Sequence, residues 1–271
     1  MNYTEKRNSQ VEFFNEPIDE YHKSGALSST HLRCFIESKN KFLNLLNNPL
    51  SKSGDALDLG SALHCMVLEF EEFNRRYAIC PEVDRRTKEG KEIWENFSMN
   101  NDHKMLLKKE QYDTCKIMSA NIYDSTIAKD LLKNSAKEEC ARVKLSNGLT
   151  IQCRPDAHKK NNIIDIKTCQ DVKDFKWDIK KHGYDIQAAF YYFILNSLYP
   201  ETYGQSNFYF IAVDKTAINE VKVFGIDNNT LNDLVERKLK PTLIEIGEFL
   251  KVIPDIKNYK YEQTEIEWIN L

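Results

Sequence analysis

Two short runs near the middle of the chain combine acids with a lysine in a pattern that suits metal-assisted hydrolysis. The first is Arg154-Pro155-Asp156 and the second is Asp165-Ile166-Lys167. Carboxylates at the ends of neighbouring strands can hold a divalent cation against a phosphodiester. The lysine can stabilise charge on phosphorus or help to position and deprotonate an attacking water. On spacing alone, a surface ion pair between Asp165 and Lys167 explains the second run equally well.

The acids of the two runs favour magnesium over other cations. Several carboxylates that converge in one place repel one another unless a cation neutralises them, and magnesium prefers oxygen ligands such as Asp156 and Asp165. Because alternate residues of a strand point the same way, Asp165 and Lys167 should share one face while Ile164 and Ile166 point to the core.

A β-hairpin upstream decides which further acid can join them. Residues 140–145 and 149–154 alternate in polarity around Asn147-Gly148, as hairpin strands do. If all apolar residues share one face, a three-residue loop, 146–148, with glycine in a bulge places Glu138 opposite Asp156. A two-residue loop places Glu139 there instead. We expect Glu138, with Glu139 as the alternative.

Composition describes an ordinary soluble chain. It has 271 residues, 41% of them apolar, and a net charge of −3. This charge argues against a protein that coats nucleic acid, although a local groove can still bind DNA. Four lysines follow the second run, and Trp177 and Tyr184 lie near them in the sequence. These lysines could line such a groove or form a solvated helix face. They are Lys173, Lys176, Lys180 and Lys181.

Cysteine usage and hydropathy indicate a reducing compartment. The seven cysteines contain no CxxC pair and none follows Cys169, which favours free thiols over a zinc site or a disulfide framework. We find no signal peptide and no apolar run of about 18 residues that could span a membrane. The expected location is therefore the cytoplasm, with no membrane partner.

The pattern of elements predicts an α/β (α+β) fold. We expect a polar N-terminal segment, 1–26, followed by a single domain, 27–271. This domain should contain a helical part (about 27–135), a sheet core (about 136–225), and a C-terminal helix and tail (about 226–271). Predicted helices begin at Ser28 or Ser29, cover 57–73 and 187–198, and start again at Asp227 or Asn228 with a bend near Pro241. Together these predict a mixed central β-sheet flanked by helices.

The ordered set of motifs resembles the PD-(D/E)xK nucleases. Within that superfamily the chain looks like the RecE (exonuclease VIII) type of the RecB-like, lambda-exonuclease-like phage exonucleases, which implies a restriction-endonuclease-like core. The resemblance rests on the two runs above, on Gly60-Ser61-Ala62-Leu63-His64, and on the helix with Tyr184, Gln187 and Tyr191. It extends from about residue 26 to about residue 225.

This resemblance implies roles for individual residues. His64, Asp156, Asp165 and the backbone carbonyl of Ile166 would be metal ligands, for two Mg²⁺ ions that Mn²⁺ can replace. Lys167 would serve the nucleophilic water, Gln187 would act in catalysis, and Glu138 or Glu139 would orient metal or water. Tyr184, Tyr191, Lys173 and Lys176 would contact DNA. Alternatively, His64 is a satisfied core histidine, and Gln187 and Tyr191 are a buried pair that anchors their helix.

The resemblance also implies an activity and partners. We expect a magnesium-dependent exonuclease that degrades linear double-stranded DNA 5′ to 3′ in phage-type recombination, within the host cytoplasm if phage-encoded. A ring-shaped trimer or tetramer and a RecT-like annealing protein would accompany it, and no iron–sulfur cluster is expected. The alternatives are an endonuclease of the same superfamily, and a catalytically silent DNA-binding or assembly module.

Overall fold

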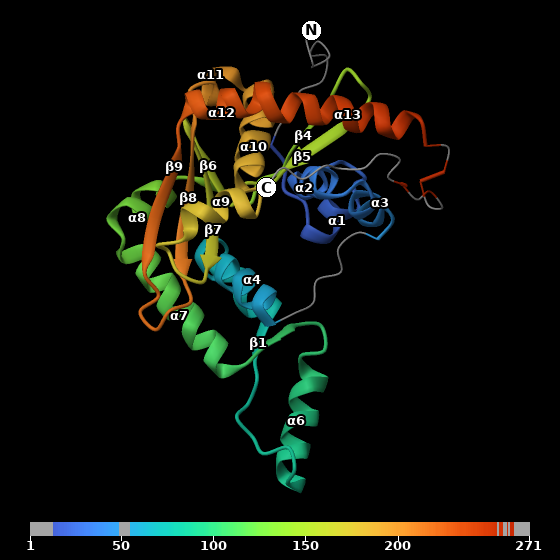
Figure 1. Ribbon diagram of the computed structural model, residues 1–271. Coiled ribbons are helices and arrows are strands. Elements are labelled where there is room, and N and C mark those ends of the chain that lie inside the picture. The colour runs from blue at the N-terminus through green and yellow to red at the C-terminus, as the bar shows by residue number, and fades with distance from the viewer. Residues whose placement is uncertain (1–12, 49–54, 254, 257–258, 260, 263–271) are drawn as a thin grey trace, which may run out of the picture.

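A five-stranded mixed sheet lies at the centre of the computed structural model, which describes residues 13–48, 55–253, 255–256, 259 and 261–262 (Figure 1). In spatial order the strands are β3 (Ala136–Lys137), β6 (Ala157–Lys159), β7 (Asn162–Cys169), β8 (Asn207–Asp214) and β9 (Val221–Ile226). β7 and β8 run parallel, whereas the other neighbours are antiparallel. The predicted mixed sheet is confirmed.

Helices cover both faces of this sheet (Figure 1). Because successive residues of a strand point to opposite faces, β7 contributes to two separate cores. Ile164 and Ile166 belong to one core, and Ile163 and Cys169 to the other. The first core contains α4 (Asp55–Leu68), α7 (Lys109–Asp124) and α8 (Thr126–Leu132). The second contains α2 (Ser29–Glu37), α10 (Tyr184–Leu198), α12 (Asn228–Leu234) and α13 (Lys240–Lys251).

The hairpin has the predicted register. It consists of β4 (Ala141–Lys144) and β5 (Thr150–Cys153), and Val143 lies opposite Ile151. Gly148 has a φ of +90°, a left-handed conformation that glycine adopts without steric cost and that closes a three-residue loop. The same register continues beyond the strands, since the Glu138 N–H donates to the Asp156 carbonyl at 3.2 Å.

One predicted helix is two helices. The apolar stripe over 57–73 is divided between α4 and α5 (Phe70–Arg76), because Glu69 has φ −134° and ψ 52°, outside the helical region. The Glu69 carboxylate accepts two hydrogen bonds from Arg76, at 2.8 and 3.0 Å, which fix the corner. Apolar periodicity reports which residues are buried and does not require one continuous helix.

The C-terminal helix changes its pitch just before Pro241, and the predicted bend there stays a prediction. Asp227 caps α12 by accepting the Thr230 N–H, and a π-helical turn, Val235–Leu239, separates α12 from α13. Pro241 is in the first turn of α13. Since proline has no N–H and its ring crowds the preceding turn, a local change in helical pitch accommodates it.

The N-terminal segment lies along the hairpin. Phe14 forms an antiparallel bridge with Cys140, and Leu27 forms a parallel bridge with Ile151. α1 (Ile18–Lys23) lies between these two bridges in the chain. The described part of the predicted segment 1–26 is therefore docked on the sheet core. Residues 1–12 of that segment, and 263–271 of the predicted tail, lie outside the described residues.

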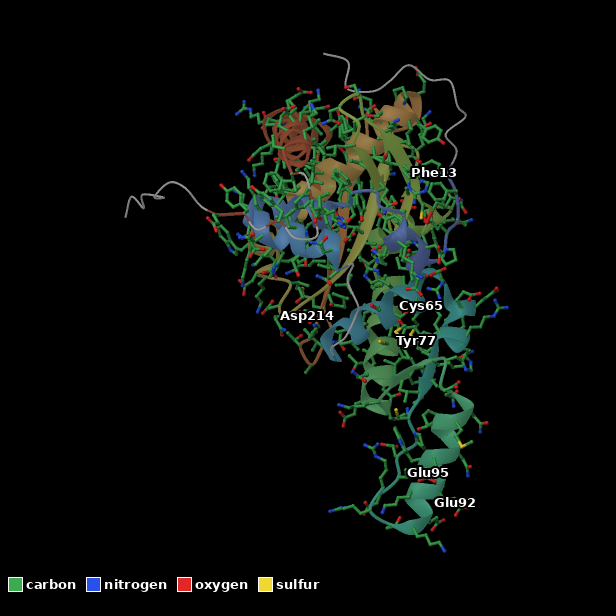
Figure 2. The ribbon with its side chains drawn as sticks, turned by 90° about the vertical axis from the view of Figure 1, so that its right-hand side faces the viewer. Phe13, Cys65, Tyr77, Glu92, Glu95 and Asp214 are labelled. Atoms are coloured by element: carbon green, nitrogen blue, oxygen red, sulfur yellow. The ribbon has the colours of Figure 1, made fainter. Side chains whose placement is uncertain are left out.

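A helical arm stands away from the rest of the molecule (Figures 1 and 2). α6 (Lys88–Asn100) carries Glu92 and Glu95 far from the central sheet. The short parallel pair β1 (Tyr77–Ile79) and β2 (Met105–Leu107) forms the base of the arm. The remaining elements are α3 (Lys39–Asn47), α9 (Phe175–Lys181) and α11 (Pro200–Tyr203). Across the described ranges, none of the helices has the length and hydropathy needed to span a bilayer.

The cap of α2 should make stability depend on pH. His31 Nδ1 accepts the Ser28 N–H at 3.1 Å, and burial, with a smaller contribution from the charge of His22, lowers the pKa of His31 to about 4. Between pH 6.5 and 4 the unfolded chain binds this proton and the folded chain does not, so stability falls as pH falls through that window. His31→Gln keeps a capping acceptor without titrating.

We therefore expect His31→Gln to lose less unfolding free energy than the wild type between pH 7 and pH 4.5, by a difference on the order of 1 kcal/mol. Urea unfolding at both pH values measures it. Equal losses in the two proteins would contradict the prediction.

Candidate metal and catalytic site

Side chains that are far apart in sequence meet at one end of the central sheet. α4 contributes one of them, β7 two and α10 one, while two more come from the links between β3 and β4 and between β5 and β6. In chain order they are His64, Glu138, Asp156, Asp165, Lys167 and Gln187.

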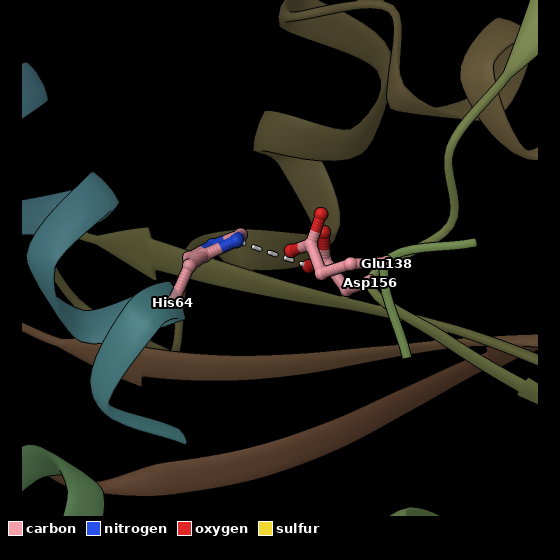
Figure 3. Close-up of side chains that lie close together, drawn as sticks. All are labelled: His64, Glu138 and Asp156. Atoms are coloured by element: carbon pink, nitrogen blue, oxygen red, sulfur yellow. Dashed lines mark ion pairs between the residues drawn. The ribbon is translucent and has the colours of Figure 1, made fainter. Parts of the chain in front are cut away.

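Three of these residues form a group with the spacing of metal ligands (Figure 3). One ligand atom each from His64, Glu138 and Asp156 lies within 4.8 Å of the others. His64 Nδ1 is 3.3 Å from Asp156 Oδ2. The predicted alternative, Glu139, points elsewhere, since its Oε2 is 3.2 Å from His158 Nε2. The structure therefore places Glu138, and not Glu139, beside the other two.

Asp156 is tied directly to the strand that carries the second motif. Its Oδ2 accepts the backbone N–H of Ile166 at 2.6 Å. The role of the Ile166 carbonyl as a metal ligand stays a prediction. This hydrogen bond sets the distance between the two sequence motifs.

Asp165 lies outside the three-residue group and faces Lys167 and Gln187. Gln187 Nε2 donates to Asp165 Oδ1 at 2.8 Å, and Lys167 Nζ is 2.5 Å from Asp165 Oδ2. Within the described residues no group donates a well-formed hydrogen bond to this buried Oδ2. The Lys167 ammonium is the charge partner of this oxygen, which has an ion pair and lacks a second, directional donor. The predicted role of Asp165 as a metal ligand remains a prediction.

Burial and crowding perturb the acids of the site. Burial, and then the charge of Asp156, raises the pKa of Glu138 above its usual range. Burial likewise raises the pKa of Asp165, while the Lys167 ammonium opposes this shift. Burial also acts on Asp156, but the charge and hydrogen bond of His64 prevail and lower its pKa. In Glu138 and Asp165, burial therefore outweighs the neighbouring positive charges.

In the two cationic groups of the site, nearby negative charge outweighs burial and raises the pKa. Burial alone would lower the pKa of His64, but the charge and hydrogen bond of Asp156 outweigh it and raise that pKa to about 9. Burial would also lower the pKa of Lys167, and the charges of Asp165 and Asp156 raise it instead. His64 is thus protonated at neutral pH and must lose its proton to become a metal ligand.

The donor set fits a divalent cation. Two carboxylates and one imidazole have the spacing of metal ligands. In the metal-free protein, a proton on His64 partly neutralises the negative charge of the two carboxylates. A divalent ion would supply more positive charge to the same carboxylates, and oxygen-rich sites favour magnesium or manganese. The residues that would hold the ion are His64, Glu138 and Asp156, with Asp165 alongside.

The residues expected to contact DNA lie in different surroundings. Lys167 Nζ lies 4.9 Å from the ring centre of Tyr184, a cation–π contact that places Tyr184 at the site. Tyr191 is only 8% exposed, which favours the alternative that it anchors α10. Lys173 and Lys176 are exposed, beside Asp171 and Trp177 respectively. DNA contact by these four residues stays a prediction.

One residue of the first motif has a role that the sequence reasoning did not assign. Arg154 Nε donates to Glu138 Oε2 at 2.6 Å, and both side chains are largely buried. The signal was present, because Arg154 directly precedes Pro155-Asp156 in the sequence. The contact itself depends on the hairpin register, which brings residues 138 and 154 together.

Metal binding should stabilise the folded protein through these ligands. Mn²⁺ at about 100 times its Kd should raise the free energy of unfolding by about 2.7 kcal/mol, because it binds the folded state alone. Asp156→Asn should remove most of this gain, as measured by thermal unfolding and calorimetry. Glu139→Gln is the matched control and should keep it. Equal stabilisation of wild type and Asp156→Asn would place the metal elsewhere.

A family model and a solved structure agree with the fold. A candidate exonuclease from Eubacterium rectale has a similar structure, with a TM-score of 0.62 and 14% identity over 94% of this chain and 96% of that one. A phage-related exonuclease from Haemophilus somnus 129PT matches with a TM-score of 0.35 and 16% identity, over 83% and 95% of the two chains. No curated protein matches the sequence. Residues 28–267 match the model of a PDDEXK-like domain of unknown function, and the chain therefore belongs to this PDDEXK-like family, DUF3799.

Proposed function

We propose that this protein is a magnesium-dependent deoxyribonuclease, an exonuclease that degrades linear double-stranded DNA from its 5′ ends in phage-type recombination. The observation that carries the proposal is the meeting of His64, Glu138 and Asp156 beside the Asp165–Lys167 pair. The PDDEXK-like family and the exonuclease description of the similar structure support a nuclease. The RecE-like order of motifs supports the direction and the biological role.

The residues of the site divide the chemical work. A bound divalent cation supplies Lewis-acid stabilisation of charge on the phosphodiester and lowers the pKa of water. His64, Glu138 and Asp156 would hold that cation. The Lys167 ammonium, held beside Asp165, would donate to a phosphoryl oxygen as negative charge develops there.

Two neutral groups orient that ammonium. Gln187 holds Asp165 through Oδ1, which leaves Oδ2 directed at Lys167. The Tyr184 ring contacts Lys167, the other partner of this pair, and its centre lies 4.9 Å from Lys167 Nζ. A lysine fixed from two sides loses little entropy when it meets the substrate, and this favours reaction.

The proposal includes an assembly and a partner. We propose a homo-oligomeric ring, a trimer or tetramer, that encloses DNA and delivers the remaining strand to a RecT-like annealing protein. Both follow from the resemblance to RecE-type exonucleases. A ring would retain the duplex, which offsets the weak general attraction of DNA to a chain of net charge −3.

Digestion of an end-labelled linear duplex tests this function. With magnesium, the protein should release the 5′ label first and leave closed circles intact. Lys167→Ala should slow cleavage by about 100- to 1,000-fold, because the phosphoryl oxygen on which negative charge develops loses its hydrogen-bond donor. Asp165→Ala should abolish cleavage. Lys160→Ala, which removes an exposed lysine from the β6–β7 turn, should cleave like the wild type.

Other outcomes would redirect the proposal. Equal cutting of circles would make the protein an endonuclease of the same superfamily. Metal binding without any cleavage of DNA would indicate a binding or assembly module. Release of the 3′ label first would reverse the polarity.

A further inference from the structure

Glu138 occupies its place in the site at a conformational cost. Its φ is +56°, in the left-handed region that side chains other than glycine rarely adopt. Such a conformation persists only where surrounding contacts impose it, and it is common at functional sites. Two contacts hold this residue: its N–H donates to the Asp156 carbonyl, and its carboxylate accepts from Arg154.

Arg154 is itself held from behind. Its Nη1 donates to the backbone carbonyl of Glu16 at 3.0 Å. The guanidinium therefore bridges the N-terminal segment and Glu138, with separate nitrogens committed to each. Its side chain is 10% exposed, so it is poorly placed to contact DNA.

The N-terminal segment fixes the position of that carbonyl. Phe14 and Cys140 exchange two backbone hydrogen bonds, at 3.1 and 2.8 Å. The Glu16 carboxylate is 3.0 Å from Arg142 Nη2. Phe13, at the start of the described segment (Figure 2), stacks on His158 with ring centres 4.4 Å apart. Backbone, charge and aromatic contacts thus lock the segment onto the strands that flank Glu138.

We propose that Arg154 is a positioning residue that holds Glu138 toward His64 and Asp156, and that residues 13–16 form part of the site because they hold Arg154. The inference rests on the metal site of the proposed function. A planar guanidinium suits this task, since its fixed fork can donate to a carboxylate and a carbonyl at once. Without it, Glu138 would lose its charge partner and one of the two contacts that hold it in a left-handed conformation.

Arg142 offers a matched control. It also binds Glu16, through the carboxylate, and it donates to the buried Gln152, but it has no described contact with Glu138. Loss of Arg142 therefore removes a second arginine contact to Glu16 and leaves both contacts of Arg154, to Glu138 and to the Glu16 carbonyl, in place.

Calorimetric titration of the protein with Mn²⁺, without DNA, tests the inference. Arg154→Ala should weaken Mn²⁺ affinity by about 10- to 100-fold, as loss of a group that orients a metal ligand does. Arg142→Ala should bind Mn²⁺ with the affinity of the wild type, because both contacts of Arg154 remain. In a Glu138→Ala background, Arg154→Ala should cause no further loss, because Arg154 acts through Glu138.

Three results would overturn the inference: an unchanged affinity in Arg154→Ala, an equal loss in Arg142→Ala, or an equal further loss in the Glu138→Ala background. If Arg154→Ala does not fold, Arg154→Lys replaces it in the same comparison, since lysine keeps the charge and lacks the fork. Failure of the proposed function can be told apart from failure of this inference. If the wild type binds Mn²⁺ but does not cleave DNA, the nuclease proposal is contradicted, and the Mn²⁺ affinities of the variants still test the role of Arg154.

Discussion

The Oδ2 atom of Asp156 accepts the Ile166 N–H at 2.6 Å and lies 3.3 Å from His64 Nδ1. These contacts join the link before β6, the strand β7 and the helix α4 at a single oxygen. A buried carboxylate is costly unless hydrogen bonds and positive charge compensate it. The placement of α4 against the sheet and the spacing of the two acidic motifs are therefore coupled, and the site exists only when all three elements are in position.

Charge balance explains the composition of the site. Three carboxylates, Glu138, Asp156 and Asp165, face three cationic groups supplied by His64, Arg154 and Lys167. Burial nevertheless raises the pKa values of Glu138 and Asp165, because desolvation penalises their charged forms more than these cationic groups compensate. A divalent cation that displaced the proton on His64 would add positive charge where these acids need it. A cluster that destabilises the metal-free protein is thereby suited to binding metal.

The alternation of one strand serves both packing and chemistry. Ile164 and Ile166 fill the core beneath α4 and α7, while Asp165 and Lys167 project from the opposite face of β7 toward α10. On α10, Gln187 reaches Asp165, and Tyr191, one turn later, is buried. The same helix thus supports the sheet and restrains a side chain of the site, so that rigid elements carry the site.

The sequence by itself determined the features that depend on local periodicity. Alternating polarity was sufficient for the shared face of Asp165 and Lys167, and together with Gly148 it favoured the hairpin register that places Glu138 opposite Asp156. Only the tertiary structure decided between Glu138 and Glu139, broke the helix at Glu69, and committed Arg154 to Glu138. The reason is physical: strand alternation and turn geometry act between neighbours in the chain. The direction of a buried charged side chain depends instead on partners that folding brings from distant segments, such as Glu16 and His64.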